Sequence, residues 1–131
     1  MINAKWFKDQ ICDELEGSTC YWKKAIDTMK AYPEWSEKFE DMAEMEQHHA
    51  TELYKMFIDM YTDTEGTDPY MKNMRDSIMN CFSTSMRKIE DYKTTYEMME
   101  KQEIKEEAVI KQETNSRGTT YERNIIGSTV G

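Results

Sequence analysis

Glycine and proline are rare in this chain and leave long stretches of sequence without interruption. The 131 residues contain 5 Gly and 2 Pro, and neither type occurs from residue 70 to residue 113. Glycine and proline are the residues least compatible with a helix interior, whereas the abundant Glu, Lys and Met residues favour helices. The pattern therefore predicts an all-α protein of one domain with a few long helices.

Apolar residues recur three and four positions apart in three stretches, which is the period of a helix with one buried face. We expect helices over residues 3–31, 33–62 and 69–113. The first must end before Tyr32, because a residue that precedes proline avoids the helical conformation. Asp68 is the expected N-cap of the third helix.

The last part of the chain has a different composition. From residue 114 onward Thr, Ser, Asn, Gly and Arg prevail, which is typical of a flexible tail. The sequence therefore predicts a helical domain over residues 1–113 and a tail over residues 114–131. The third helix is expected to be longer than the first two, and its end is expected to fray, bend or meet a second chain.

The net charge of −9 disfavours nucleic acid or an anionic membrane surface as the main partner and suits a protein that attracts cations. No apolar stretch approaches the length of a membrane span. The first ten residues carry Lys5, Lys8 and Asp9 in place of the apolar core of a signal peptide. We therefore expect a cytoplasmic protein.

The chain has three cysteines, Cys12, Cys20 and Cys81. Their number is odd, and no two of them have the CxxC spacing of a metal or redox motif. In a cytoplasmic protein such cysteines are expected to be reduced, partly buried thiols rather than metal ligands.

Two titratable residues interrupt the apolar face of the second predicted helix. Glu46 and His49 are three residues apart, so both side chains lie on one helix face and can reach one cation. A carboxylate on an apolar face needs a partner, and a cation is a natural one. The alternative is a semi-buried His49 bonded to Glu46; the neighbouring His48 is expected to face solvent.

The first helix offers a matching acid in the sequence Asp-Glu-Leu-Glu over residues 13–16. Glu14, followed by Tyr21 and then by Glu46-x-x-His49, resembles the first half of the ferritin-like superfamily, as in the rubrerythrins. The local sequences over 13–21 and 44–50 look closest to the encapsulated ferritins, whose chains carry half a helical bundle. The resemblance covers residues 10 to 60.

This resemblance implies an iron-binding ferroxidase with a di-iron centre, in which manganese is the alternative metal. It assigns Glu14, Glu46 and His49 as the metal ligands and catalytic residues, with Glu46 as the bridging carboxylate. Glu16 would be a secondary carboxylate on the path of the incoming metal. The alternative is that Glu14 and Glu16 are solvated surface charges.

The chain departs from a complete ferritin because it has no histidine after His49. The third helix offers only Asp76, Glu90 and Glu97 as acids that could point inward. One chain therefore cannot supply the usual six ligands, whereas two chains related by a two-fold axis supply four carboxylates and two imidazoles. We expect a ferritin-like half-bundle that is completed by dimerisation, in a homodimer or a higher homo-oligomer.

The C-terminal sequence resembles the docking peptides by which encapsulated ferritins bind the inside of encapsulin shells. Such peptides have an aliphatic pair, Gly-Ser and a further aliphatic residue, and Thr129 stands where Leu is usual. The resemblance implies a shell protein as partner and a location inside a protein nanocompartment; the alternative is a disordered end. The residues implied in docking are Ile125, Ile126, Gly127, Ser128 and Val130.

The sequence thus favours a ferroxidase that oxidises Fe(II) and supplies iron for storage in a shell. One alternative is a non-catalytic structural or cargo protein of a shell or virion, with a degenerate metal site. A second is a rubrerythrin-like peroxidase or another di-metal oxidase, which ranks lower because the sequence has no CxxC rubredoxin module to relay electrons.

Overall fold

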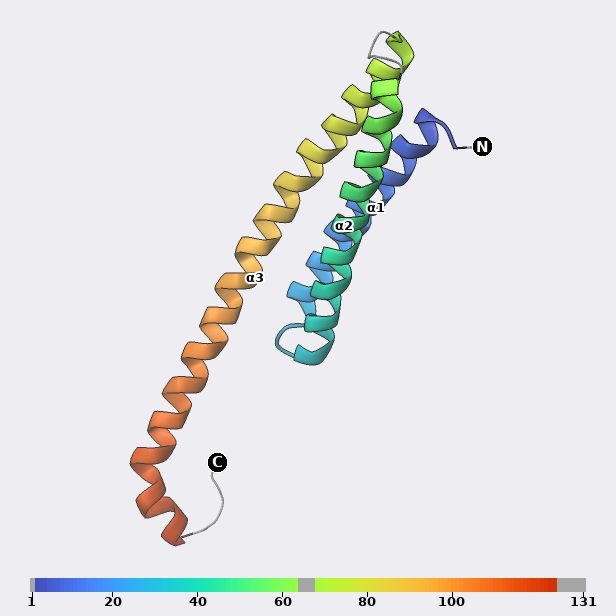
Figure 1. Cartoon of the computed structure of the whole chain (residues 1–131). Coiled ribbons are helices and arrows are strands. Elements are labelled where there is room, and N and C mark those ends of the chain that lie inside the picture. Colours follow the sequence, from blue (N-terminus) through green and yellow to red (C-terminus); the bar gives the residue numbers. More distant parts are fainter. Residues whose placement is uncertain (1, 64–67, 125–131) are drawn as a thin grey trace. The chain divides into compact units, whose positions relative to one another are not determined.

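The computed structural model describes residues 2–63 and 68–124, with side chains described for 2–62 and 68–112. These residues form three α-helices and no strand (Figure 1): α1 (Ala4–Thr28), α2 (Pro33–Asp63) and α3 (Pro69–Asn124). The prediction of an all-α fold with three long helices is confirmed. None of the described helices combines the length and the apolarity that a membrane crossing requires.

Polar side chains fix where two of the helices begin. The Asn3 carboxamide oxygen accepts a hydrogen bond from the Trp6 backbone N–H at 2.9 Å, and the Asp68 carboxylate accepts one from the Tyr70 N–H at 2.9 Å. Both satisfy amides that a helix start leaves unpaired. The predicted N-cap at Asp68 is confirmed.

The helix ends differ from the predicted ones. The first helix stops at Thr28 rather than near residue 31, and the chain then turns directly into α2. The third helix continues to Asn124, so the predicted boundary between residues 113 and 114 falls inside it. The predicted docking residues at 125–130 lie outside the described residues.

The chain divides into two compact units, Met1–Tyr96 and Glu97–Gly131. The first unit contains α1, α2 and the first half of α3. The second unit contains the rest of α3, and among its described side chains four large apolar ones are exposed: Met98, Ile104, Val109 and Ile110. Among the described side chains, the buried core therefore lies in the first unit.

Small side chains bring α1 and α2 close together. Ser18 is fully buried and donates a hydrogen bond from its hydroxyl to the Ala43 carbonyl at 2.8 Å. Ser36, also buried, donates one to the Ala25 carbonyl. Each bond satisfies a buried hydroxyl and fixes how far one helix can slide along the other.

The first half of α3 packs on this helix pair through larger side chains. The rings of Trp22 and Tyr96 lie edge to face with centroids 5.6 Å apart, and those of Tyr54 and Phe82 do so at 5.4 Å. A continuous apolar cluster draws on all three helices; its buried members are Ala4, Phe7, Ile11, Leu15, Ala50, Phe57, Met71 and Ile78.

A disulfide also joins α1 to α3. It links Cys12 to Cys81, whose Cα atoms are 5.8 Å apart, while Cys20 is a free, exposed thiol. The prediction of three reduced thiols was therefore wrong for two of them. The pair lies 69 positions apart in the sequence and becomes adjacent only when α3 folds back over α1.

Removing this disulfide should destabilise the fold. A bond that closes so long a loop restricts the unfolded chain, so we expect Cys81→Ser to lower the free energy of unfolding by about 2–4 kcal/mol. Urea denaturation of the oxidised proteins, followed by circular dichroism, measures this loss. Cys20→Ser is the matched control and should unfold at the wild-type midpoint; a Cys81→Ser variant as stable as wild type would contradict the prediction.

Candidate metal centre

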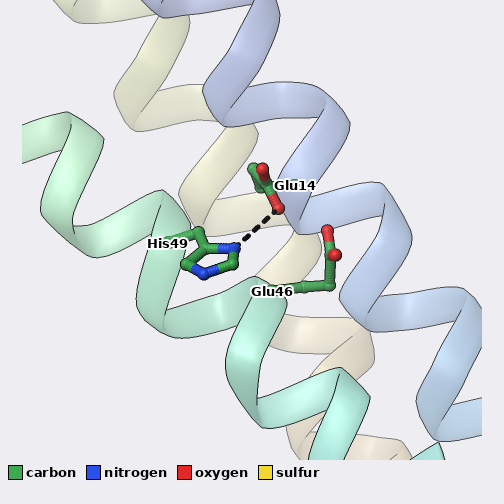
Figure 2. A group of neighbouring side chains, drawn as sticks. All are labelled: Glu14, Glu46 and His49. Atoms are coloured by element: carbon green, nitrogen blue, oxygen red, sulfur yellow. Dashed lines mark ion pairs between the residues drawn. The ribbon is translucent and has the colours of Figure 1, made fainter.

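Glu14, Glu46 and His49 meet at one edge of the contact between α1 and α2. Glu14 comes from the middle of α1, and Glu46 and His49 come from α2 one turn apart (Figure 2). Each side chain offers a ligand atom that lies within 4.8 Å of the other two. Elsewhere in the described part of the chain, no three His, Cys, Asp or Glu side chains meet this condition. The structure therefore brings together the three residues that the sequence predicts as ligands.

The packing of α1 on α2 positions this group. Leu15 and Ser18 on α1 are fully buried, as are Ala43 and Ala50 on α2. Glu14 precedes Leu15 in α1, so it lies at the margin of the buried stripe rather than on the solvent side of the helix. On α2, Glu46 is three residues after the buried Ala43 and His49 directly precedes the buried Ala50, so both lie at the margin of the buried stripe of that helix.

Glu14 is more enclosed than His49. Its side chain is 22% exposed, against 49% for His49, and its Oε2 atom is buried without a hydrogen-bond partner. The His49 Nδ1 atom lies 3.6 Å from this oxygen, which is an ion pair when the imidazole is protonated but too long for a good hydrogen bond. Leaving a buried carboxylate oxygen without a partner is costly, and a bound cation would supply one. Glu14 does not fit the alternative of a solvated surface charge.

The two carboxylates compete for ionisation. The pKa of Glu46 is raised from its ordinary 4.5 to about 7, chiefly by a hydrogen bond with Glu14, then by burial and by the negative charge of Glu14. The nearby His49 opposes this rise. A pKa of about 7 means that Glu46 is mostly protonated below neutral pH in the metal-free protein, so that it can donate a hydrogen bond to the Glu14 carboxylate. A cation between the two carboxylates would remove the need for that proton.

The other residues considered from the sequence lie outside this group. Glu16 is exposed and is not part of it. Tyr21 is half-buried and stacks on Phe39, with ring centroids 6.1 Å apart. His48 is exposed beside Glu52, as predicted.

Within its described residues, α3 contributes no member of the carboxylate–histidine group. The acids considered there, Asp76, Glu90 and Glu97, are all exposed, and Asp76 pairs with Arg75 at 3.2 Å. The group of one chain therefore consists of two carboxylates and one imidazole.

One residue that contacts the group was missed from the sequence. Gly17 lies in the middle of α1, and a Cβ atom there would come within 2.9 Å of the Glu46 Oε2 atom. The signal was available, because a glycine inside a helical pattern lowers helix stability and needs a reason to be there.

The donor chemistry fits iron or manganese. Carboxylate oxygens suit hard cations and imidazole suits iron, and a Glu paired with a Glu-x-x-His motif is the repeating half of a carboxylate-bridged di-iron centre in helical bundles. The fold and this group together define a helical protein of the di-metal carboxylate class.

Comparison with known proteins agrees with this class. The family model described as Rubrerythrin matches residues 7–123, and the chain belongs to the rubrerythrin family. This places it in the ferritin-like superfamily, in which rubrerythrin-like domains are commonly di-iron redox proteins. The search of curated proteins and the search of solved structures gave no match.

The raised pKa of Glu46 predicts how pH affects the stability of the metal-free protein. The pKa of Glu46 is higher in the folded chain than in the unfolded chain. The free energy of unfolding therefore falls as pH rises from about 4.5 to about 7, because the folded chain resists loss of this proton. Glu46→Gln removes that fall in stability, so the variant should be more stable than wild type above pH 7 and similar to it below pH 4.5. Because Glu46 is partly exposed, we expect a gain of no more than about 1 kcal/mol.

Thermal unfolding of chelator-treated proteins at pH 4, 6 and 8 measures this effect. Glu37→Gln, which changes an exposed acid of the same helix, is the matched control and should show no gain that grows with pH. A Glu46→Gln variant that is less stable than wild type at pH 8 would contradict the assignment of a shared proton.

Proposed function

We propose that this protein is a ferroxidase of the encapsulated-ferritin type, which oxidises Fe(II) at a di-iron centre formed between two copies of the chain. The observation that carries the proposal is the convergence of Glu14, Glu46 and His49 within 4.8 Å of one another. Membership of the rubrerythrin family supports a di-iron centre.

The number of ligands supports a centre shared by two chains. A di-iron site of this class takes four carboxylates and two imidazoles, which is twice the set of one chain. A two-fold axis beside the group would supply the second set, because each surface in such a dimer meets a copy of itself.

The surface around the group also supports pairing. The first half of α3 contacts α2 through Gln47, which bonds to Met86, and Tyr54, which packs on Phe82. Met42 and Met56 each lie seven residues, or about two turns, from His49, so helical spacing puts them in line with His49 on another flank of α2. These methionines are 39% and 56% exposed. A second copy on this flank would bury both methionines together with the metal ligands.

The residues of the group suit the oxidation of iron. Fe(II) entering as substrate would displace the proton of Glu46, whose carboxylate would then bind iron as an anion. Ionised carboxylates bind Fe(III) more strongly than Fe(II), which favours oxidation. Two Fe(II) ions each lose one electron, and these electrons with two protons reduce one O₂ to hydrogen peroxide. The net charge of −9 would draw Fe(II) toward the protein.

We further propose that the oxidised iron is stored in a protein shell in the cytoplasm, to which the C-terminal sequence docks. This part of the proposal rests on the sequence alone, through the resemblance of residues 125–130 to encapsulin docking peptides. Manganese is the alternative metal for the same donor set.

A non-catalytic helical protein with a degenerate site is the second candidate. It is favoured by the observation that the described part of one chain supplies only three ligands, one of which is half exposed. Metal content separates the two functions, since the ferroxidase must bind about one iron per chain.

Iron oxidation by purified protein tests the proposed reaction. We expect the full chain to take up about one Fe(II) per chain without oxygen and to oxidise it rapidly when O₂ is added. Glu46→Ala should abolish paired iron binding and slow oxidation to the rate without protein, while Glu37→Ala should behave as wild type.

Absorbance of Fe(III) and an oxygen electrode follow the reaction. Oxidation kinetics in Glu46→Ala that equal those of wild type, or a wild-type chain that binds no iron, would refute the ferroxidase. Oxidation that proceeds with hydrogen peroxide but not with O₂ would instead identify a peroxidase.

The proposed dimer can be broken at the exposed methionines. A charge on this flank would be buried without a partner, so Met56→Asp should shift the protein toward monomers and reduce iron oxidation at least about tenfold. Analytical ultracentrifugation and the oxidation assay measure the two effects. Met79→Asp, at an exposed methionine of α3, is the control; a Met56→Asp variant that stays dimeric and active would contradict the proposed interface.

A further inference from the structure

Gly17 occupies a position where glycine has an energetic cost. It lies in the interior of α1, where glycine is less favourable than alanine by about 1 kcal/mol. The residues on both sides of it are helical, so neither a turn nor a helix cap accounts for it. The reason for a glycine must therefore be the space that the absence of a side chain leaves beside the helix backbone.

The space beside Gly17 is taken by the side chain of Glu46. A Cβ atom on Gly17 would come within 2.9 Å of the Glu46 Oε2 atom, 3.4 Å of its Cδ atom and 3.7 Å of its Cγ atom. The first distance is too short for a carbon and an oxygen that are not bonded, whereas the last is ordinary contact. The Glu46 carboxylate therefore rests directly on the backbone of α1.

The helices themselves cannot easily move apart to admit a larger residue. Ser18, next to Gly17, is fully buried and donates its hydroxyl to the carbonyl of Ala43, one turn before Glu46. Because this bond fixes the two backbones beside Gly17, the flexible end of Glu46 is the group that must yield.

Gly17 and Glu14 lie one turn apart on α1, so both are on the flank of this helix that lies near the Glu46 carboxylate. Contact with Gly17 holds this carboxylate near Glu14 and His49. A methyl group at position 17 would push it out of the space that it shares with them.

We propose that Gly17 is a positioning residue for the metal centre: its missing side chain lets the Glu46 carboxylate lie against α1 within reach of Glu14 and His49. This inference rests on the proposed metal centre. Alanine at this position should spread the three donors and weaken metal binding without unfolding the helix.

Calorimetric titration of the full chain with Co(II) under nitrogen, where no oxygen can oxidise the metal, tests the proposal. We expect Gly17→Ala to weaken Co(II) binding by about tenfold or more, the usual effect of a residue that supports a metal ligand. Its unfolding midpoint should stay the same or rise, because alanine favours the helix. Cys20→Ala raises the helix propensity of α1 at an exposed position and should bind Co(II) as wild type does.

A double-mutant cycle separates positioning from a general distortion of α1. Glu46→Asp shortens the side chain by one methylene and removes the clash, so adding Gly17→Ala to Glu46→Asp should cost little further Co(II) affinity. A general distortion would cost the same affinity in both backgrounds.

The outcomes distinguish the inference from the proposed function. If the wild-type chain binds no Co(II) and no Fe(II), the metal centre itself is refuted. If the wild-type chain binds metal and Gly17→Ala binds it equally well, only the role of Gly17 is refuted. Equal losses in the two backgrounds, or loss of the helical circular dichroism signal in Gly17→Ala, would also overturn that role.

Discussion

The close approach of two carboxylates at the margin of the α1–α2 contact is the constraint on which the site depends. The pKa of Glu46 rises there to about 7, chiefly through its hydrogen bond with Glu14 and then through burial and the negative charge of Glu14. The hydrogen bond from Ser18 to Ala43 and the absent side chain of Gly17 hold this arrangement in place. The fold thus makes ionisation of Glu46 unfavourable, and a metal ion between the two carboxylates would offset that cost.

The helices could be predicted from the sequence because the signals for them are local. Scarce glycine and proline, a three-four apolar period and the N-cap at Asp68 each act within a few residues, and all agree. The end of α3 was missed because its Thr, Ser and Asn residues disfavour a helix only weakly, and the first glycine in that region, Gly118, is itself helical. The Cys12–Cys81 disulfide was missed because no local pattern reports which thiols meet when α3 packs on α1.

The metal centre was predictable to the extent that it lies within single helices. Glu46 and His49 share a face of one helix, so their spacing alone brings them together. The choice of Glu14 over its acidic neighbours needed the family resemblance, because helix periodicity does not show which acid faces α2. The contact of Gly17 with Glu46 depends on the distance between two helices, and the second half of the proposed centre would come from another chain. Neither can be derived from the order of residues in one chain.

The central claim is that two copies of this chain place their carboxylate–histidine groups on either side of one pair of metal ions. Anomalous diffraction at the iron absorption edge, from crystals of the iron-loaded protein, tests it most directly. The account predicts two iron peaks between two copies, each within bonding distance of Glu14, Glu46 or His49 side chains from both chains. Iron held by one chain alone, or iron absent from this group in a protein that contains it elsewhere, would contradict the account.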